Sequence, residues 1–186
     1  MRNKRQPFDK TICASLLFDL DNLEWLSLFI WTNNMANNKL NSQQIEILGR
    51  NFLVSLLIAD GLEVALPVRD RGVDLIAYSD IPKDGSKFRA VPIQLKAFRK
   101  AGFNLDIKYS KFPNLLMAYV WNSTEPSKSE LYLMTYGQAV DLAAQLSPYF
   151  SKHGKYARTS DSSNLNMVLK PYKYQQDMFA NIVSAL

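Results

Sequence analysis

The sequence predicts an α/β protein with a central mixed β-sheet of about five strands flanked by helices. Short runs rich in β-branched and aromatic side chains recur along the chain and predict the strands. Apolar residues three and four positions apart precede and follow these runs, which is typical of amphipathic helices. Of the 186 residues, 47% are hydrophobic, so the chain can bury a sizeable core.

Residues 1–34 differ from the rest and are predicted to be an N-terminal extension to a single domain at 35–186. Acidic residues interrupt the apolar run of this extension, so we predict neither a signal peptide nor a membrane span. Met35 opens a polar segment that leads into a strong helix pattern. One hypothesis is that Met35 is the native start. The rival interpretation is a poorly packed N-terminal helix.

The first half of the domain is predicted to be one helix followed by three strands. Ser42 is the expected cap of a helix of about 18 residues, and Asp60-Gly61 is its expected end. The apolar face of this helix is predicted to be Ile45, Leu48, Phe52, Leu56 and Ala59. Strands are predicted at 62–67, 72–78 and 88–97, with a hairpin loop at 79–86.

The second half is predicted to add two strands, a helix and a C-terminal segment. The strands are expected at 115–121 and 130–134, and the helix at 138–146. Residues 151–164 are expected to form a flexible loop, and 166–170 a last short strand. A final helix is predicted at 172–186, with Met178, Ile182 and Leu186 on one side.

Three polar residues interrupt the apolar pattern of two neighbouring strands. Asp74 lies in the second predicted strand, and Gln94 and Lys96 lie in the third. Side chains two positions apart share one face of a strand, so Gln94 and Lys96 are expected to point the same way. If the strands pair, all three groups converge. Burying such groups without partners costs about 1–3 kcal/mol each, so we expect them to serve a function.

This arrangement resembles the PD-(D/E)XK nuclease superfamily, in which an Asp on one strand of a hairpin meets a Glu-x-Lys or Asp-x-Lys triplet on the next. The resemblance covers roughly residues 43–146, with Gln94-Leu95-Lys96 as the triplet. Gln94 departs from the usual acid, although a Gln-x-Lys variant occurs in the superfamily. The resemblance implies a restriction-endonuclease-like core in the order α-β-β-β-α-β. Only residues 101–111 are available for the crossover helix.

The resemblance also implies a metal-dependent nuclease that uses Mg²⁺ or Mn²⁺. Asp74, Gln94 and the backbone carbonyl of Leu95 would be the metal ligands, and Lys96 would orient the attacking water. The superfamily often adds a Glu from the first helix, and Glu46 is the candidate here. The usual spacing falls on Arg50 instead, so Glu46 either reaches the site or pairs with Arg50. Asp70 is a further spare acid.

A basic segment next to the triplet suggests a nucleic-acid partner, with DNA the expected one. Between residues 85 and 111 there are seven basic side chains and one acid, and the predicted phosphate contacts are Arg99, Lys100, Lys108 and Lys111. Interleaved aromatic residues, Phe98, Phe103, Tyr109 and Phe112, could stack on bases or belong to the core. The overall net charge of +5 is compatible with either an anionic partner or an ordinary surface.

Other functions remain open at this level. Asp74 could cap a turn, Lys96 could be a solvated strand residue, and Glu46 could be an ordinary helix-start acid. The same fold could bind nucleic acid without cutting, or bind a protein, and a homodimer is compatible with the sequence. Cys13 is the only cysteine, which excludes an intrachain disulfide and fits a cytoplasmic protein. A catalytic histidine would have to be His153.

Overall fold

The structure, a computed structural model, describes residues 40–69, 71–79, 88–112, 114–147, 155–159 and 163–184. The predicted extension at 1–34, Met35, most of the hairpin loop, Asp70, His153 and Leu186 lie outside these residues. No helix in the described part of the chain is both long enough and apolar enough to cross a membrane.

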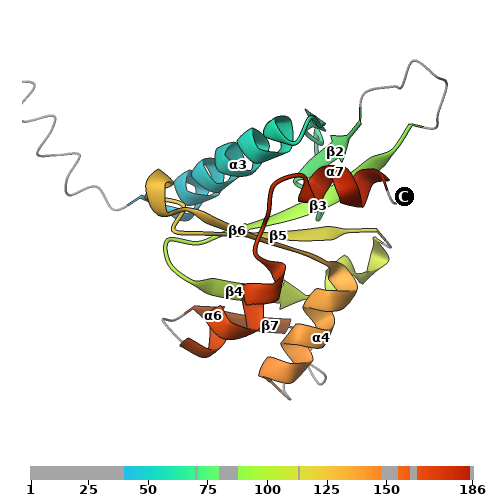
Figure 1. Ribbon diagram of the computed structural model, residues 1–186. Helices are drawn as coiled ribbons and strands as arrows, with labels where there is room; N and C mark the ends of the chain where they lie inside the picture. Colours follow the sequence, from blue (N-terminus) through green and yellow to red (C-terminus); the bar gives the residue numbers. More distant parts are fainter. Residues whose placement is uncertain are drawn as a thin grey trace, which may run out of the picture. The chain divides into compact units, whose positions relative to one another are not determined.

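The central sheet is mixed and has five strands, as predicted (Figure 1). Its strands are β1 (Glu63–Ala65), β2 (Leu75–Tyr78), β3 (Ala90–Ala97), β5 (Leu116–Trp121) and β6 (Glu130–Thr135), in the order β1-β2-β3-β5-β6. The pair β3–β5 is parallel, and the other neighbours are antiparallel. All six residues of β5 are buried, because this strand is covered on both faces.

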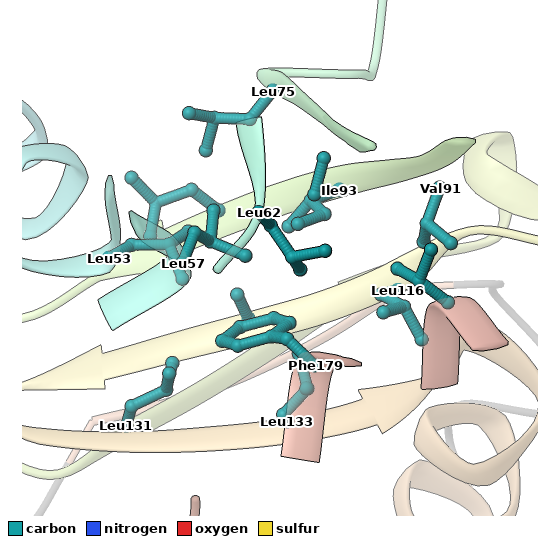
Figure 2. Close-up of a cluster of buried hydrophobic side chains, with 14 of the residues drawn as sticks. Leu53, Leu57, Leu62, Leu75, Val91, Ile93, Leu116, Leu131, Leu133 and Phe179 are labelled. Atoms are coloured by element: carbon teal, nitrogen blue, oxygen red, sulfur yellow. The ribbon is translucent and has the colours of Figure 1, made fainter. Parts of the chain in front are cut away.

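Each face of the central sheet has its own hydrophobic core. Helices α3 (Ser42–Ala59) and α7 (Met178–Ser184) cover one face, where Leu53, Leu57 and Phe179 pack on the strands (Figure 2). Helices α4 (Tyr136–Leu146) and α6 (Ser163–Leu169) lie on the other face with a second, two-stranded sheet (Figure 1). The result is a layered α/β arrangement that buries both faces of the sheet.

The connection between β3 and β5 contains a strand and a 3₁₀ helix instead of the expected crossover α-helix. Strand β4 (Gly102–Asp106) pairs with β7 (Lys155–Thr159), and η1 (Ile107–Lys111) follows β4. Phe103 and Leu105 are buried two positions apart, which is the periodicity of a strand. The predicted α-β-β-β-α-β order was therefore wrong at this step, although the three strands before it and the parallel strand after it form as expected.

Helix α3 begins one residue earlier than predicted, and its buried face matches the predicted one only in part, since Phe52 and Leu56 pack against the core but are only partly buried. Its cap is Asn41, which forms a capping box with Gln44. The buried positions are Gly49, Leu53 and Leu57, whereas Leu48, which was predicted to face the core, is 36% exposed. The cause is a close approach between helix and sheet, since a Cβ at Gly49 would lie 2.5 Å from the Cβ of Ala97.

We expect Gly49→Ala to destabilise the protein by about 1–2 kcal/mol, because the added methyl must push α3 away from β3. Gly137→Ala is the matched control, since a Cβ there would meet nothing closer than 3.9 Å. This exposed helical position should gain about 0.5–1 kcal/mol from the substitution. Urea unfolding of both variants measures the difference. Equal stability changes at the two glycines would refute the close-approach explanation.

The C-terminal third differs most from its predicted form. The expected loop at 151–164 contributes strand β7, and the expected strand at 166–170 is helical, because Leu165 and Leu169 lie one turn apart and are both buried. Within the last helix predicted at 172–186 the structure forms α7, and η3 (Lys170–Tyr172) lies where that helix was expected to begin. The fully buried residues of α7 are Phe179 and Val183, and Met178 and Ile182 are partly buried against the same core. A further 3₁₀ turn, η2 (Pro126–Lys128), precedes β6.

Candidate active site

A pocket of about 420 Å³ lies where β2 begins and β3 ends. Its walls come from α3, the turn before β2, the end of β3, and η1. It brings together the predicted metal ligands, the predicted lysine and two cations: the lining residues are Glu46, Arg71, Gly72, Asp74, Gln94, Leu95, Lys96, Lys108 and Tyr109. Residues that are 63 positions apart in the sequence thus meet at one site.

Asp74 is fixed by the pairing of β2 with β3. It directly precedes β2, and its backbone N–H donates to the carbonyl of Ile93 at 2.8 Å. Its Oδ2 accepts hydrogen bonds from the Leu95 backbone N–H, at 2.7 Å, and from the Gln94 side-chain amide. These bonds hold the Asp74 carboxylate against β3. An aspartate that only capped a turn would bond within its own turn and not to a neighbouring strand.

Gln94 is 4% exposed and provides the observation that bears most directly on metal binding. Its Nε2 donates both to Asp74 Oδ2 and to the carbonyl of Leu95, the latter at 3.1 Å. Its Oε1 is buried and accepts no hydrogen bond from the described residues. Burying an acceptor without a hydrogen-bond donor costs about 1–3 kcal/mol of folding free energy. Turning the amide about its last bond would exchange these two atoms.

The effect of turning the Gln94 amide shows whether the site suits a cation. This rotation would set the Gln94 oxygen against the oxygens of Asp74 and Leu95, with which the amide nitrogen now bonds. Three oxygens directed at one point repel one another unless a cation lies between them. Carboxylate, amide and carbonyl oxygens are the donors that Mg²⁺ and Mn²⁺ prefer. The residues present therefore fit a hard divalent ion.

Lys96 is half-buried and is held by Tyr109. Its Nζ donates to the Tyr109 hydroxyl at 2.9 Å and lies 5.1 Å from the centre of the ring. Burial raises the pKa of the Tyr109 phenol, and the Lys108 ammonium partly opposes this shift, while Asp74 and Asp106 add to it. The phenol therefore stays neutral at physiological pH. A solvated strand lysine would not be held in this way.

Glu46 both lines the pocket and pairs with Arg50, so the two alternatives predicted for it occur together. The two side chains lie 2.5 Å apart and are 49% and 31% exposed. An exposed pair one helical turn apart contributes only about 0.3–0.5 kcal/mol, so little energy is needed to release Glu46.

The four predicted basic contacts do not all line the same pocket. Lys108 lines the site pocket, whereas Arg99 and Lys100 line a second pocket beside the start of α3. Lys111 lies 5.0 Å above the ring of Phe112. Among the interleaved aromatics, Phe103 is completely buried and Tyr109 is 4% exposed. These two rings belong to the core and are not available to stack on bases.

Two lining residues, Arg71 and Gly72, were not predicted as part of the site, and Tyr109 was predicted only as an aromatic residue that could stack on bases or belong to the core. Arg71 and Gly72 belong to a segment that the sequence indicated only as a polar turn. Gly72 has φ +100°, a conformation that glycine adopts easily, and this turn places Arg71 in the wall. Tyr109 reaches the site because η1 replaces the expected crossover helix. Gly72 is a local sequence signal for this turn, whereas no local pattern indicated that Tyr109 would reach the pocket.

The described residues contain no group of three or more His, Cys, Asp or Glu side chains that could hold a metal ion. The oxygen donors that meet around Asp74 are instead its carboxylate, the Gln94 amide and the Leu95 backbone carbonyl, and the Glu46 carboxylate lines the same pocket. The sequence matches no protein-family model and no curated protein, and the structure matches no solved structure. The function must therefore be inferred from the geometry of the site.

Proposed function

We propose that the protein is a metal-dependent nuclease that hydrolyses phosphodiester bonds, with DNA as its substrate. The observation that supports this most is the position of the Gln94 amide, which bonds to Asp74 Oδ2 and to the Leu95 carbonyl at once. Once the amide has turned its own oxygen toward these two oxygens, a cation could bind among the three. Lys96 and two further cations line the same pocket, so a phosphate group would meet both kinds of charge there.

Asp74, Gln94 and the Leu95 carbonyl are the proposed ligands of Mg²⁺ or Mn²⁺. When bound, such an ion polarises the scissile phosphate and lowers the pKa of a coordinated water. Asp74 supplies the negative charge of this set, and Gln94 adds a neutral oxygen that carries no charge of its own. We expect the site to hold the ion more weakly than one with two carboxylates.

The cationic residues of the pocket bind and orient the substrate in this proposal. Lys96 orients the attacking water and offsets the negative charge that grows on the phosphate in the transition state. Arg71 and Lys108, which line the same pocket, bind substrate phosphates. Glu46 can exchange its bond with Arg50 for a contact inside the pocket.

We expect Lys96→Ala to lower the cleavage rate by about 100-fold, because a preorganised group that stabilises transition-state charge contributes this much. Nicking of supercoiled plasmid in Mg²⁺ or Mn²⁺ measures the rate. Lys128→Ala is the matched control, since Lys128 is 69% exposed and does not line this pocket. Equal nicking by wild type and both variants would show that the pocket is not the catalytic site.

A second candidate is a protein that binds nucleic acid on this fold without cutting it. The specific observation in its favour is that Gln94 satisfies Asp74 with a neutral donor, so the two side chains pair without an ion. Binding to DNA that weakens with salt, together with no metal-dependent nicking, would support this candidate over the nuclease.

A further inference from the structure

The 3₁₀ helix η1 places a tyrosine against two of the three cations that line the proposed active site, Lys96 and Lys108. Tyr109 is 4% exposed, and its hydroxyl accepts a hydrogen bond from Lys96 Nζ at 2.9 Å. The ammonium groups of Lys96 and Lys108 lie 5.1 Å and 5.0 Å from the centre of its ring. Both distances are within the range of a cation–π interaction. One side chain therefore contacts two lysines that line the same pocket.

The surroundings of Tyr109 fix it in this position. A Cβ at Gly72 would lie 3.1 Å from two atoms of the ring, so the backbone of the turn before β2 packs directly against the tyrosine. Asp106 caps η1 by accepting a hydrogen bond from the Lys108 backbone N–H at 3.0 Å. The turn that carries Asp74 and the element that carries Tyr109 are thus packed together, so the ring has little freedom to move.

We propose that Tyr109 is a positioning residue. Its hydroxyl fixes the position of the Lys96 ammonium group, and its ring fixes the position of the Lys108 ammonium group. This inference rests on the proposed nuclease function. A neutral phenol can orient an ammonium group without cancelling its charge, whereas a carboxylate in the same place would neutralise it. The full positive charge of Lys96 then remains for the phosphate. The ring does the same for Lys108, which binds a substrate phosphate.

The two contacts can be separated by substitution. Tyr109→Phe removes the hydroxyl and keeps the ring, so we expect kcat to fall by roughly ten- to 100-fold with KM unchanged, as for a slightly misplaced catalytic group. Tyr109→Leu removes both contacts, and KM should then also rise by about two- to fivefold, the size of an exposed cation–π contribution. Steady-state nicking of supercoiled plasmid in Mg²⁺ gives both constants.

Tyr132→Phe is the matched control for loss of a buried tyrosine hydroxyl. Tyr132 is also 4% exposed, and its hydroxyl bonds to Glu130 at 3.0 Å, which does not line the pocket. This variant should keep the kcat and KM of the wild type. A loss of kcat in Tyr132→Phe equal to that in Tyr109→Phe would overturn the proposal, because the effect would then come from stability alone.

A second measurement needs no catalysis. In ¹H–¹⁵N spectra of the lysine ammonium groups of the metal-free protein, the Lys96 signal is expected to shift and broaden in Tyr109→Phe and to stay unchanged in Tyr132→Phe. An unchanged Lys96 signal in Tyr109→Phe overturns the proposal, as does an unchanged kcat when the wild type is active. If the wild type does not nick DNA, the proposed function fails, and the Lys96 signal alone decides whether Tyr109 holds the lysine.

Discussion

Replacing Asp74 with asparagine is expected to lower Mg²⁺-dependent cleavage of plasmid DNA by about 1,000-fold, because a bound divalent ion contributes several kcal/mol to transition-state stabilisation. Asp74 is the carboxylate of the proposed ligand set. Asparagine keeps an oxygen that can accept the hydrogen bond of the Leu95 backbone N–H, so the fold should be preserved. Plasmid nicking measures the loss, and thermal unfolding checks the fold. A variant that cuts as fast as the wild type would contradict the proposed site.

Asp74→Asn removes a negative charge from the proposed ligand set, and a substitution that adds one is its control. Gln94→Glu places a second carboxylate against Asp74, where the Gln94 amide now donates a hydrogen bond. Without metal the two negative groups repel, so this variant should be less stable than the wild type. Its affinity for Mn²⁺ should rise by about tenfold or more, as affinity for divalent ions increases with ligand charge. Mn²⁺ should therefore raise its melting temperature more than that of the wild type.

Replacing Asp60 with alanine is expected to destabilise the protein by about 3–4 kcal/mol, because three donors in partly or fully buried hydrogen bonds lose their acceptor. Asp60 ends α3 and is 8% exposed. Its carboxylate accepts hydrogen bonds from the Tyr174 hydroxyl at 2.6 Å and from the backbone N–H groups of Asp177 and Phe179 at 3.1 and 3.2 Å. One side chain thus joins the end of α3 to the start of α7, more than 100 positions later in the sequence.

The control for Asp60 is Asp141→Ala, an exposed aspartate on α4. This change should alter the free energy of unfolding by no more than about 0.5 kcal/mol. Urea unfolding of both variants gives the comparison. In native-state hydrogen exchange, the amides of α7 should lose protection in Asp60→Ala, since this helix would lose its anchor. Similar stability of the two variants would mean that the Asp60 contacts contribute little.

A helix or strand is predicted well from the sequence when the hydrophobicity of its own residues is enough to show which of them are buried. Strand β5 is buried along its whole length, and its apolar run was recognised for that reason. The buried face of α3 was predicted only in part, because the contact of Gly49 with Ala97 depends on the approach of helix and sheet. A glycine carries no hydrophobic signal, so periodicity cannot place it against a core. The short helix α6 was missed because its two buried leucines were too few to establish a helical period.

Some residues of the site could likewise be predicted from local patterns in the sequence, and others could not. Asp74, Gln94 and Lys96 lie on two strands joined by a hairpin, so pairing of neighbouring strands was enough to bring them together. Arg71 and Tyr109 reach the pocket only through a turn with positive φ and through a crossover that forms β4 and η1. Their positions depend on packing between distant segments, which no spacing in the sequence expresses.

The most direct test of the metal site is a crystal of the wild-type protein soaked with Mn²⁺ and examined for anomalous scattering. We expect a peak in contact with the Asp74 carboxylate, the Gln94 side-chain oxygen and the Leu95 carbonyl, with the Gln94 amide turned relative to its metal-free orientation. No peak at a Mn²⁺ concentration that supports nicking, with the Gln94 nitrogen still donating to Asp74, would contradict the proposed catalytic site.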